Sequence, residues 1–258
     1  MLRMMRSKAF GRFRLLGALV ALGLSAAPAG AEGPACRDAD FEGTRYSYCQ
    51  AEAGQDLRLF LRGDDGEIYG SFGRLSSALE QQGRRLLFAM NAGMFHADRA
   101  PVGLYVEEGE QAASIVTREG PGNFGLLPNG VFCIEDGRFD VIESRAFADS
   151  RRDCRFATQS GPMLVIDGAL HPRFLPDSDS LHIRNGVGVS ADGQQAYFVI
   201  SDAAVTFHQF ARFFRDVLET PNALYLDGSV SRLYAPSLDR SDWGMPLGPI
   251  VGLVAPAG

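Results

Sequence analysis

The feature that most constrains the fold is a repeated dipeptide, an acidic residue followed by glycine, which stands between short apolar segments. Such pairs readily form the tight turn of a β-hairpin, and those here separate plausible strands, for example 57–61 from 68–72 and 183–189 from 196–200. The chain is therefore predicted to be rich in strands with mainly antiparallel pairing. The pairs are Asp65-Gly66, Glu108-Gly109, Asp136-Gly137, Asp167-Gly168 and Asp192-Gly193.

Two helices are expected among these strands. The first is short, covers 75–82 and ends at Gly83. The second begins at Thr206, which has capping-box spacing to Gln209, and it must end before Pro221. These elements indicate an α+β fold, with a mixed but mainly antiparallel sheet and a few packed helices. The second helix has apolar residues at steps of three and four, which predict one buried face: Phe207, Phe210, Ala211, Phe214, Val217 and Leu218.

Residues 1–31 have the layout of a secretory signal peptide. Basic residues without any acid precede an apolar run at 15–27, and small residues up to Ala31 mark a cleavage site. A membrane-spanning helix is the alternative, but the run is shorter than the roughly 20 residues that a bilayer requires. We therefore expect a periplasmic or secreted protein with one domain at 32–258 and no membrane span after cleavage.

Loss of this leader would make an acidic chain more acidic. The whole chain has a formal net charge of −6, and removal of the five basic leader residues lowers it by five, to −11. Such a surface repels nucleic acid and acidic membranes. Nucleic-acid partners are thereby excluded, an anionic substrate would need local arginines, and the oligomeric state stays open.

The chain has four cysteines, all beyond the leader: Cys36, Cys49, Cys133 and Cys154. In an exported chain an even number indicates disulfides, and sequence proximity favours Cys36–Cys49 and Cys133–Cys154 among three possible pairings. A zinc site is the alternative, but no CxxC pair or nearby histidine supports it. We expect no cofactor and no metal ligands, and a divalent metal is left open.

The segment 222–234, NALYLDGSVSRLY, contains the strongest candidate for a functional residue. Its apolar residues predict a buried strand that delivers Asp227 into a turn of glycine and serine. Burial of an unpaired carboxylate costs about several kcal/mol, so a carboxylate in this position points to a ligand. The alternative is a turn in which Asp227 caps its own backbone, and the local residues explain both equally well.

Other polar residues stand where predicted strands begin or end. Asn91 follows the strand 86–90, and its amide suits a sugar hydroxyl, although asparagine in such a place commonly caps a loop. Arg184 and Asn185 open a strand of small residues, where a planar guanidinium could hold phosphate or carboxylate. Asp202 is a second strand-end carboxylate, with helix capping as its alternative role.

A third candidate segment, ATQSGPMLVIDG, contains Gln159 and Ser160 immediately before a Gly-Pro turn. A nucleophilic serine requires an activating base and usually lies in a GxSxG elbow between a strand and a helix. That context is missing around Ser160, so a serine esterase is the weaker alternative.

As an ordered set these segments resemble the phosphodiester glycosidase family, which includes the lysosomal uncovering enzyme, N-acetylglucosamine-1-phosphodiester alpha-N-acetylglucosaminidase. The resemblance covers about 86–234 and rests on MNAGMF, PNGVF, TQSGPMLVIDG, RNGVGV, a strand ending at Asp202, the amphipathic helix and LYLDGSVS. Asp227 and Gly228 match the start of the family's LDGGGS loop and Ser231 matches its serine. Ser229 and Val230 replace two glycines, which restricts the loop backbone.

The resemblance implies roles for these residues. Asp227 would be the nucleophile, the base or the group that stabilises an oxocarbenium ion, while Arg184 would neutralise a departing phosphate and Asp202 would be the reserve second carboxylate. A phosphate monoester has a second pKa of about 6 and leaves with little protonation. The remaining substrate-binding candidates are Asn91, Gln159, Ser160, Asn185, Gly228, Ser229 and Ser231.

We therefore expect an exported hydrolase acting on a sugar-1-phosphodiester or a related glycosidic bond, with an envelope glycan as one candidate substrate. The partner is then a carbohydrate or a sugar phosphate. The competing class is a non-catalytic glycan-binding or envelope-assembly protein on the same fold, because a fold does not establish an activity.

Overall fold

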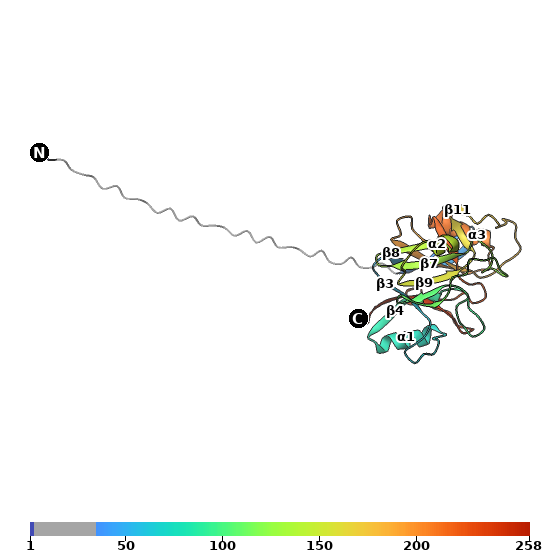
Figure 1. Ribbon diagram of the computed structural model, residues 1–258, viewed down its shortest axis with the longest axis horizontal. Coiled ribbons are helices and arrows are strands. Elements are labelled where there is room, and N and C mark those ends of the chain that lie inside the picture. The colour runs from blue at the N-terminus through green and yellow to red at the C-terminus, as the bar shows by residue number, and fades with distance from the viewer. Residues whose placement is uncertain (3–34) are drawn as a thin grey trace. The chain divides into compact units, whose positions relative to one another are not determined.

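Antiparallel strand pairing builds most of the computed structural model, which describes residues 1–2 and 35–258 (Figure 1). The predicted signal peptide lies outside the described residues apart from its first two positions. Gly33–Gly258 form one compact unit. Within the described part, every named strand pair is antiparallel, so the α+β prediction is confirmed while the expected mixed sheet is replaced by three antiparallel sheets.

The largest sheet has seven strands in the order β1-β2-β13-β12-β14-β10-β11. Its central neighbours β12 and β14 pair from Gly186–Tyr225 to Val189–Asn222. The start of β12 therefore lies beside the end of β14, and residues just outside both strands emerge at one edge. The strands are β1 (Cys36–Phe41), β2 (Thr44–Glu52), β10 (Met163–Ile166), β11 (Ala169–Leu170), β12 (Asn185–Val189), β13 (Gln195–Ser201) and β14 (Asn222–Tyr225).

Two five-stranded sheets, ordered β16-β15-β4-β17-β3 and β6-β5-β9-β7-β8, complete the sheet structure of the described residues. The first contains β3 (Asp56–Phe60), β4 (Arg84–Asn91), β15 (Leu233–Ala235), β16 (Arg240–Ser241) and β17 (Ile250–Pro256). The second contains β5 (Tyr105–Glu107), β6 (Glu110–Ala113), β7 (Gly130–Glu135), β8 (Arg138–Glu143) and β9 (Phe156–Ser160). The ends of β4 and β9 thus carry two of the predicted site residues, Asn91 and Ser160.

Four of the five predicted hairpins form. The turns at 108–109, 136–137, 167–168 and 192–193 join β5 to β6, β7 to β8, β10 to β11 and β12 to β13. The glycine of each turn has a positive φ, which glycine adopts without steric cost. At 65–66 only an isolated bridge from Arg62 to Ile68 forms. The strand predicted at 68–72 is wrong, because Phe72 is already the first residue of a helix.

That helix, α1 (Phe72–Gln81), begins three residues before the predicted position, because Ser71 accepts a hydrogen bond from Arg74 N–H and caps it. It lies beside β4, whereas α3 (Phe207–Arg212) lies beside β11 (Figure 1). A short helix, α2 (Ser144–Asp149), and a 3₁₀ turn, η2 (Pro236–Leu238), escaped prediction. None of the helices in the described part combines the length and the apolar character needed to cross a bilayer.

Helix α3 begins where predicted, with Thr206 capping Gln209 N–H at 3.1 Å. The capping box is not reciprocal, since the Gln209 amide donates to Thr44 instead. The helix continues as a π-helical segment, η1 (Phe213–Val217), which turns Phe213 into the core. The hydrogen bonds of a π-helix span one residue more than those of an α-helix, which shifts the side chains that follow. Val217, which was predicted to be buried, is therefore 41% exposed.

The three sheets meet in one aromatic cluster. Phe198 of β13 contacts Phe88 of β4 and Phe132 of β7, with ring centroids 5.4 and 5.6 Å apart. All three rings are buried, and each comes from a different sheet. Packing of these rings therefore fixes the sheets relative to one another, which positions the strand ends that carry the polar residues.

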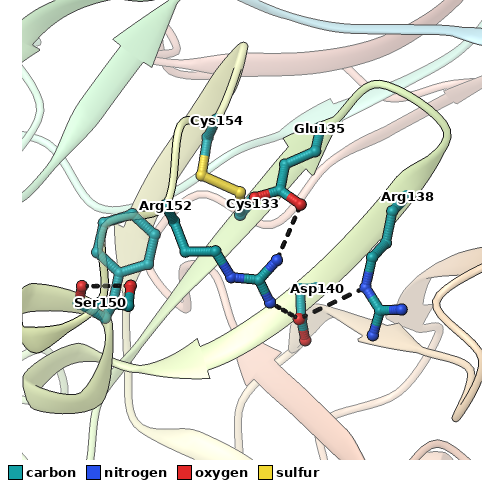
Figure 2. Close-up of a disulfide and its surroundings, with 8 residues drawn as sticks. Cys133, Glu135, Arg138, Asp140, Ser150, Arg152 and Cys154 are labelled. Carbon is teal, nitrogen blue, oxygen red and sulfur yellow. Dashed lines mark hydrogen bonds and ion pairs between the residues drawn. A yellow bond between two sulfur atoms is a disulfide. The ribbon is translucent and has the colours of Figure 1, made fainter.

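Both predicted disulfides are present, Cys36–Cys49 and Cys133–Cys154. The zinc alternative is therefore wrong for these residues, because bonded sulfurs offer no thiolate. Figure 2 shows the second bridge beside Arg152, whose guanidinium pairs with Glu135 at 2.8 Å and also with Asp140. The bridge ties β7 to the segment that leads into β9.

Removal of Cys133–Cys154 by a double alanine substitution should lower the free energy of unfolding by about 3 kcal/mol, since the bridge closes a loop with a separation of 21 residues. Urea unfolding measures this loss. The matched control is the double alanine variant at Cys36 and Cys49, whose separation of 13 residues should make its loss slightly smaller. Thiols that react with an alkylating agent in the unreduced, exported protein would contradict both bridges.

Candidate functional site

A chain of amide hydrogen bonds joins the ends of β4, β12 and β14. Asp227 N–H donates to Asn185 Oδ1 at 2.9 Å, and Asn185 Nδ2 donates to Asn91 Oδ1. The same oxygen of Asn91 accepts a bond from Arg232 N–H at 3.0 Å. A backbone N–H can only donate, so these contacts fix the orientation of both side-chain amides. Asn91 and Asn185 thus hold the main chain on both sides of the turn that begins at Asp227.

Two serines hold the same segment. Ser160 Oγ donates to the Leu226 carbonyl at 2.6 Å, and Ser231 Oγ donates to the Asp227 carbonyl at 2.8 Å. Ser160 is buried and its hydroxyl proton is engaged by the backbone. This geometry gives no support to Ser160 as a nucleophile and identifies it as a support for the strand that precedes Asp227.

Gln159 was predicted to bind substrate, but its amide is fully engaged within the protein. Oε1 accepts from the N–H groups of Leu104 and Val116, while Nε2 donates to the Val116 carbonyl and to Ser144 Oγ. Both donors and both lone pairs are therefore used. In the structure Gln159 fastens two loop segments to β9 and offers no free polar group.

The carboxylate of Asp227 is buried, with 6% of the residue exposed, and no ion pair reaches it within the described part of the chain. Its Oδ1 accepts a hydrogen bond from Ser229 N–H at 2.8 Å. Burial raises the pKa of Asp227, and the backbone N–H groups of Ser229, Val230 and Gly228 oppose that rise. Asp227 therefore has both features that the sequence offered as alternatives. It caps its own turn, and it is a buried carboxylate without a counter-ion.

The guanidinium of Arg184 is wholly buried, which differs from the accessible position expected from its small neighbours. Nε donates to the Val205 carbonyl at 2.8 Å and Nη2 to the Ser180 carbonyl at 2.9 Å. The ring of Phe207 covers it, 3.6 Å from Cζ to the centroid. Burial lowers the pKa of Arg184, but an arginine remains charged. Phe207, predicted to be core alone, is thus also part of the site.

Tyr225 is the residue that sequence reasoning missed. It is the last residue of β14 and precedes Asp227 by two positions. Burial raises the pKa of Tyr225 to about 12, while the charge of Arg184 lowers it and that of Asp227 raises it. The charges of Arg184 and Asp227 therefore both reach Tyr225. The available signal was this spacing, but within an apolar run the tyrosine was assigned to the core.

Several buried polar atoms at this site have no hydrogen-bond partner in the described residues: Asn91 Nδ2, Arg184 Nη1 and the Tyr225 hydroxyl. An unsatisfied buried polar group costs about 1–3 kcal/mol, so native proteins rarely retain one without a reason. Each of these atoms is a hydrogen-bond donor. A ligand with several acceptor oxygens would satisfy them, and phosphate is such a group.

Of the remaining candidates, Asp202 lies in other surroundings, whereas Ser229 and Ser231 belong to the turn that begins at Asp227. Asp202 pairs with Arg240 at 2.6 Å and with Arg45 at 3.8 Å, in a partly exposed cluster that also includes Ser47. The structure therefore does not join Asp202 to Asp227. The exposed Ser229 lies on the turn itself, and the single hydroxyl proton of Ser231 is shared between the Asp227 carbonyl at 2.8 Å and the Ile183 carbonyl at 3.0 Å.

Comparison with known proteins assigns this fold and site to a family. The phosphodiester glycosidase family profile matches residues 84–244, a range that includes Asn91, Arg184, Tyr225 and Asp227. The chain belongs to the phosphodiester glycosidase family. It is 35% identical over 191 residues to the "Uncharacterized protein YigE" of Escherichia coli (strain K12), which covers 74% of each chain.

Two solved structures share the fold. The catalytic domain of zebrafish N-acetylglucosamine-1-phosphodiester alpha-N-acetylglucosaminidase, auto-inhibited by its pro-peptide, has a TM-score of 0.58 and 13% identity over 86% of this chain and 84% of its own. The "Putative exported protein" of Burkholderia pseudomallei K96243 has a TM-score of 0.53 and 12% identity over 81% of this chain and 74% of its own. At these identities the likeness concerns the fold.

The tight contact between Gly228 and Tyr225 predicts a coupled mutational effect. A Cβ on Gly228 would lie 1.8 Å from the Tyr225 hydroxyl oxygen, so Gly228→Ala should destabilise the protein by about 1–3 kcal/mol through overpacking. In a Tyr225→Phe background that oxygen is absent and the cost should be smaller. Urea unfolding of both single variants and the double variant gives the coupling energy. Additive losses would show that the turn avoids the tyrosine by moving away.

The raised pKa of Asp227 predicts how its removal changes stability. The folded state binds this proton more tightly than the unfolded state, so the resulting stabilisation is complete below the unfolded-state pKa and is lost as pH rises through the folded-state pKa. Asp227→Asn removes this dependence and should be at least as stable as the wild type near pH 7. Urea unfolding between about pH 4 and about pH 7 tests this. Lower stability at neutral pH would mean that the turn's N–H bonds outweigh the burial of charge.

Proposed function

We propose that the protein is an exported hydrolase that cleaves the bond between a sugar and phosphate in a sugar-1-phosphodiester. The observation that carries this proposal is that Asp227 and Arg184 are both buried without an ion pair among the described residues, and that the charges of both act on Tyr225. Unsatisfied donors lie on Asn91, Arg184 and Tyr225. Keeping opposite charges buried and apart is costly unless a ligand uses them. Membership of the phosphodiester glycosidase family supports the same chemistry.

In this proposal, water adds to the anomeric carbon as the bond to the phosphate oxygen breaks. Asp227 stabilises the positive charge that develops at that carbon and accepts the proton of the water, and Arg184 takes up the negative charge of the departing phosphate. Ordinary glycosidases use a second carboxylic acid to protonate the leaving oxygen. A phosphate monoester leaves as an anion and needs little protonation. One carboxylate and one arginine are then sufficient, which agrees with the engagement of Asp202 by arginines elsewhere.

Other features of the chain support the proposal that the protein is exported. The described part of the chain contains no free cysteine and two disulfides, and disulfides persist in oxidising compartments such as the periplasm. The leader pattern at 1–31 points to the same location. An envelope glycan that carries sugar phosphates is the substrate class available there. We propose no cofactor, since the positive charge at the site comes from an arginine.

A non-catalytic glycan-binding protein is the second candidate, and one observation favours it. Arg184 and Tyr225 are both wholly buried, so a ligand reaches them only after a movement of the covering segments. A protein that merely holds a glycan phosphate at its surface would need neither turnover nor Asp227.

The test of activity offers the purified protein a sugar-1-phosphodiester, with and without a chelator, and measures release of the phosphomonoester. Asp227→Asn should lower kcat by about 10³-fold or more, because the charge at the anomeric carbon is then uncompensated. The matched control is Asp64→Asn, which changes an exposed aspartate far from the site in sequence and should leave kcat unchanged. Asp202→Asn should retain most activity. Turnover that survives in Asp227→Asn, or is absent on every sugar phosphate tried, would reject the hydrolase proposal.

A further inference from the structure

The Tyr225 hydroxyl is a buried polar group that the family resemblance did not single out. Its proton has no acceptor among the described residues, although the hydroxyl lies against Gly228, and Arg184 acts on its oxygen both as a charge and as a hydrogen-bond donor. Arg184 offers only N–H donors, so it cannot accept the hydroxyl proton. Tyr225 therefore keeps a free O–H donor within the electrostatic influence of Asp227.

We propose that Tyr225 and Arg184 together form the phosphate subsite of this protein, with the tyrosine hydroxyl as a neutral hydrogen-bond donor to the leaving phosphate. This inference rests on the proposed function and adds a second group to it. The subsite would pair one cation with one neutral donor, and both would bind oxygens of the same phosphate. It would not supply a proton to the leaving group.

One aromatic ring holds both donors in place. The ring of Phe207 stacks on the Arg184 guanidinium and meets the Tyr225 ring edge to face, with centroids 4.7 Å apart at 82°. Phe174 stacks on the outer side of Phe207 at 4.9 Å. Groups fixed in this way need little reorganisation as charge develops on a leaving group, which is the condition for effective electrostatic catalysis.

The position of the hydroxyl explains why residue 228 is glycine. Any side chain there would occupy the space of the Tyr225 oxygen, since a Cβ would lie 1.8 Å from it. Gly228 is half-buried and the next residue, Ser229, is exposed, so this turn lies between the hydroxyl and solvent. Movement of the turn would open the subsite to a phosphate group.

This arrangement selects a class of substrate. Burial raises the pKa of the Tyr225 hydroxyl to about 12, so it stays protonated at neutral pH and its pKa lies far from the value near the working pH that suits a general acid. A phosphate needs no such proton, but its charge benefits from a donor and a cation. The subsite therefore favours glycosyl phosphodiesters over simple O-glycosides of the same sugar.

Tyr46 provides a matched control within the same core. It is also wholly buried, its hydroxyl also lacks a partner, and its ring stacks on Phe213 at 4.3 Å. It lies on β2, and the charge that acts on it comes from Glu42, with no contribution from Arg184 or Asp227. Loss of the Tyr46 hydroxyl thus reproduces the structural effect of a Tyr→Phe change without touching the subsite.

The experiment compares Tyr225→Phe with Tyr46→Phe in two assays. For a glycosyl phosphodiester, kcat/KM should fall by about 10²–10³-fold in Tyr225→Phe, as it does when one donor to a developing anion is removed. For an aryl glycoside of the same sugar, the change should be below about threefold because no phosphate leaves. Binding of inorganic phosphate, measured by calorimetry, should weaken roughly tenfold to hundredfold in Tyr225→Phe. Tyr46→Phe should match the wild type in each assay.

The outcomes separate this inference from the proposed function. Wild-type turnover that Tyr225→Phe retains, or equal losses in Tyr46→Phe, would overturn the role of Tyr225 and leave the hydrolase intact. Phosphate binding that only Tyr225→Phe loses, in a protein without turnover, would support the subsite and reject the hydrolase. If Tyr225→Phe unfolds, Gly228→Ala displaces the hydroxyl without removing it and should weaken phosphate binding as well. A wild type that neither binds phosphate nor turns over substrate would reject both.

Discussion

The hydrogen bond between Asn185 and Asn91 is the interaction on which the site depends. It connects a strand of the seven-stranded sheet to a strand of a neighbouring sheet, and each amide also takes a backbone N–H from the turn around Asp227. Ser160 adds a contact from the third sheet. The carboxylate is therefore positioned by all three sheets at once, and a shift of any one of them would move it.

The same arrangement accounts for the unusual electrostatics. Asp227 and Arg184 are buried without forming an ion pair. Their charges shift the pKa of Tyr225 in opposite directions, and the proton of the Tyr225 hydroxyl has no acceptor in the described residues. Folding alone would be served better by direct pairing of the charges or by apolar residues. The Phe207 ring holds Arg184 in place, and the Asn91 and Asn185 amides hold the turn at Asp227. Charged groups that are buried without pairing to each other are expected at a site that binds a ligand.

Local sequence patterns predicted much of the fold, and they failed at identifiable places. Acid–glycine pairs gave four hairpins, and Thr206 gave the start of α3. The pair at 65–66 did not give a hairpin because Ser71 caps a helix that begins at Phe72. Val217 left the buried face because a π-helical turn follows Arg212. In each failure a neighbouring contact changed the register of a correctly recognised apolar pattern.

The sequence by itself determined the α+β class and the family, favoured the two disulfides that form, and predicted a functional role for the strand end at Asp227, because turn chemistry, cysteine spacing and ordered motifs are local properties. Only the tertiary structure separated Asp202 from the site, turned Gln159 and Ser160 into supports, and added Tyr225 to Arg184. These assignments depend on which partner each polar group meets across the three sheets. Spacing along the sequence cannot specify such contacts, because the group that accepts or donates a hydrogen bond to a buried polar atom is commonly far away in sequence.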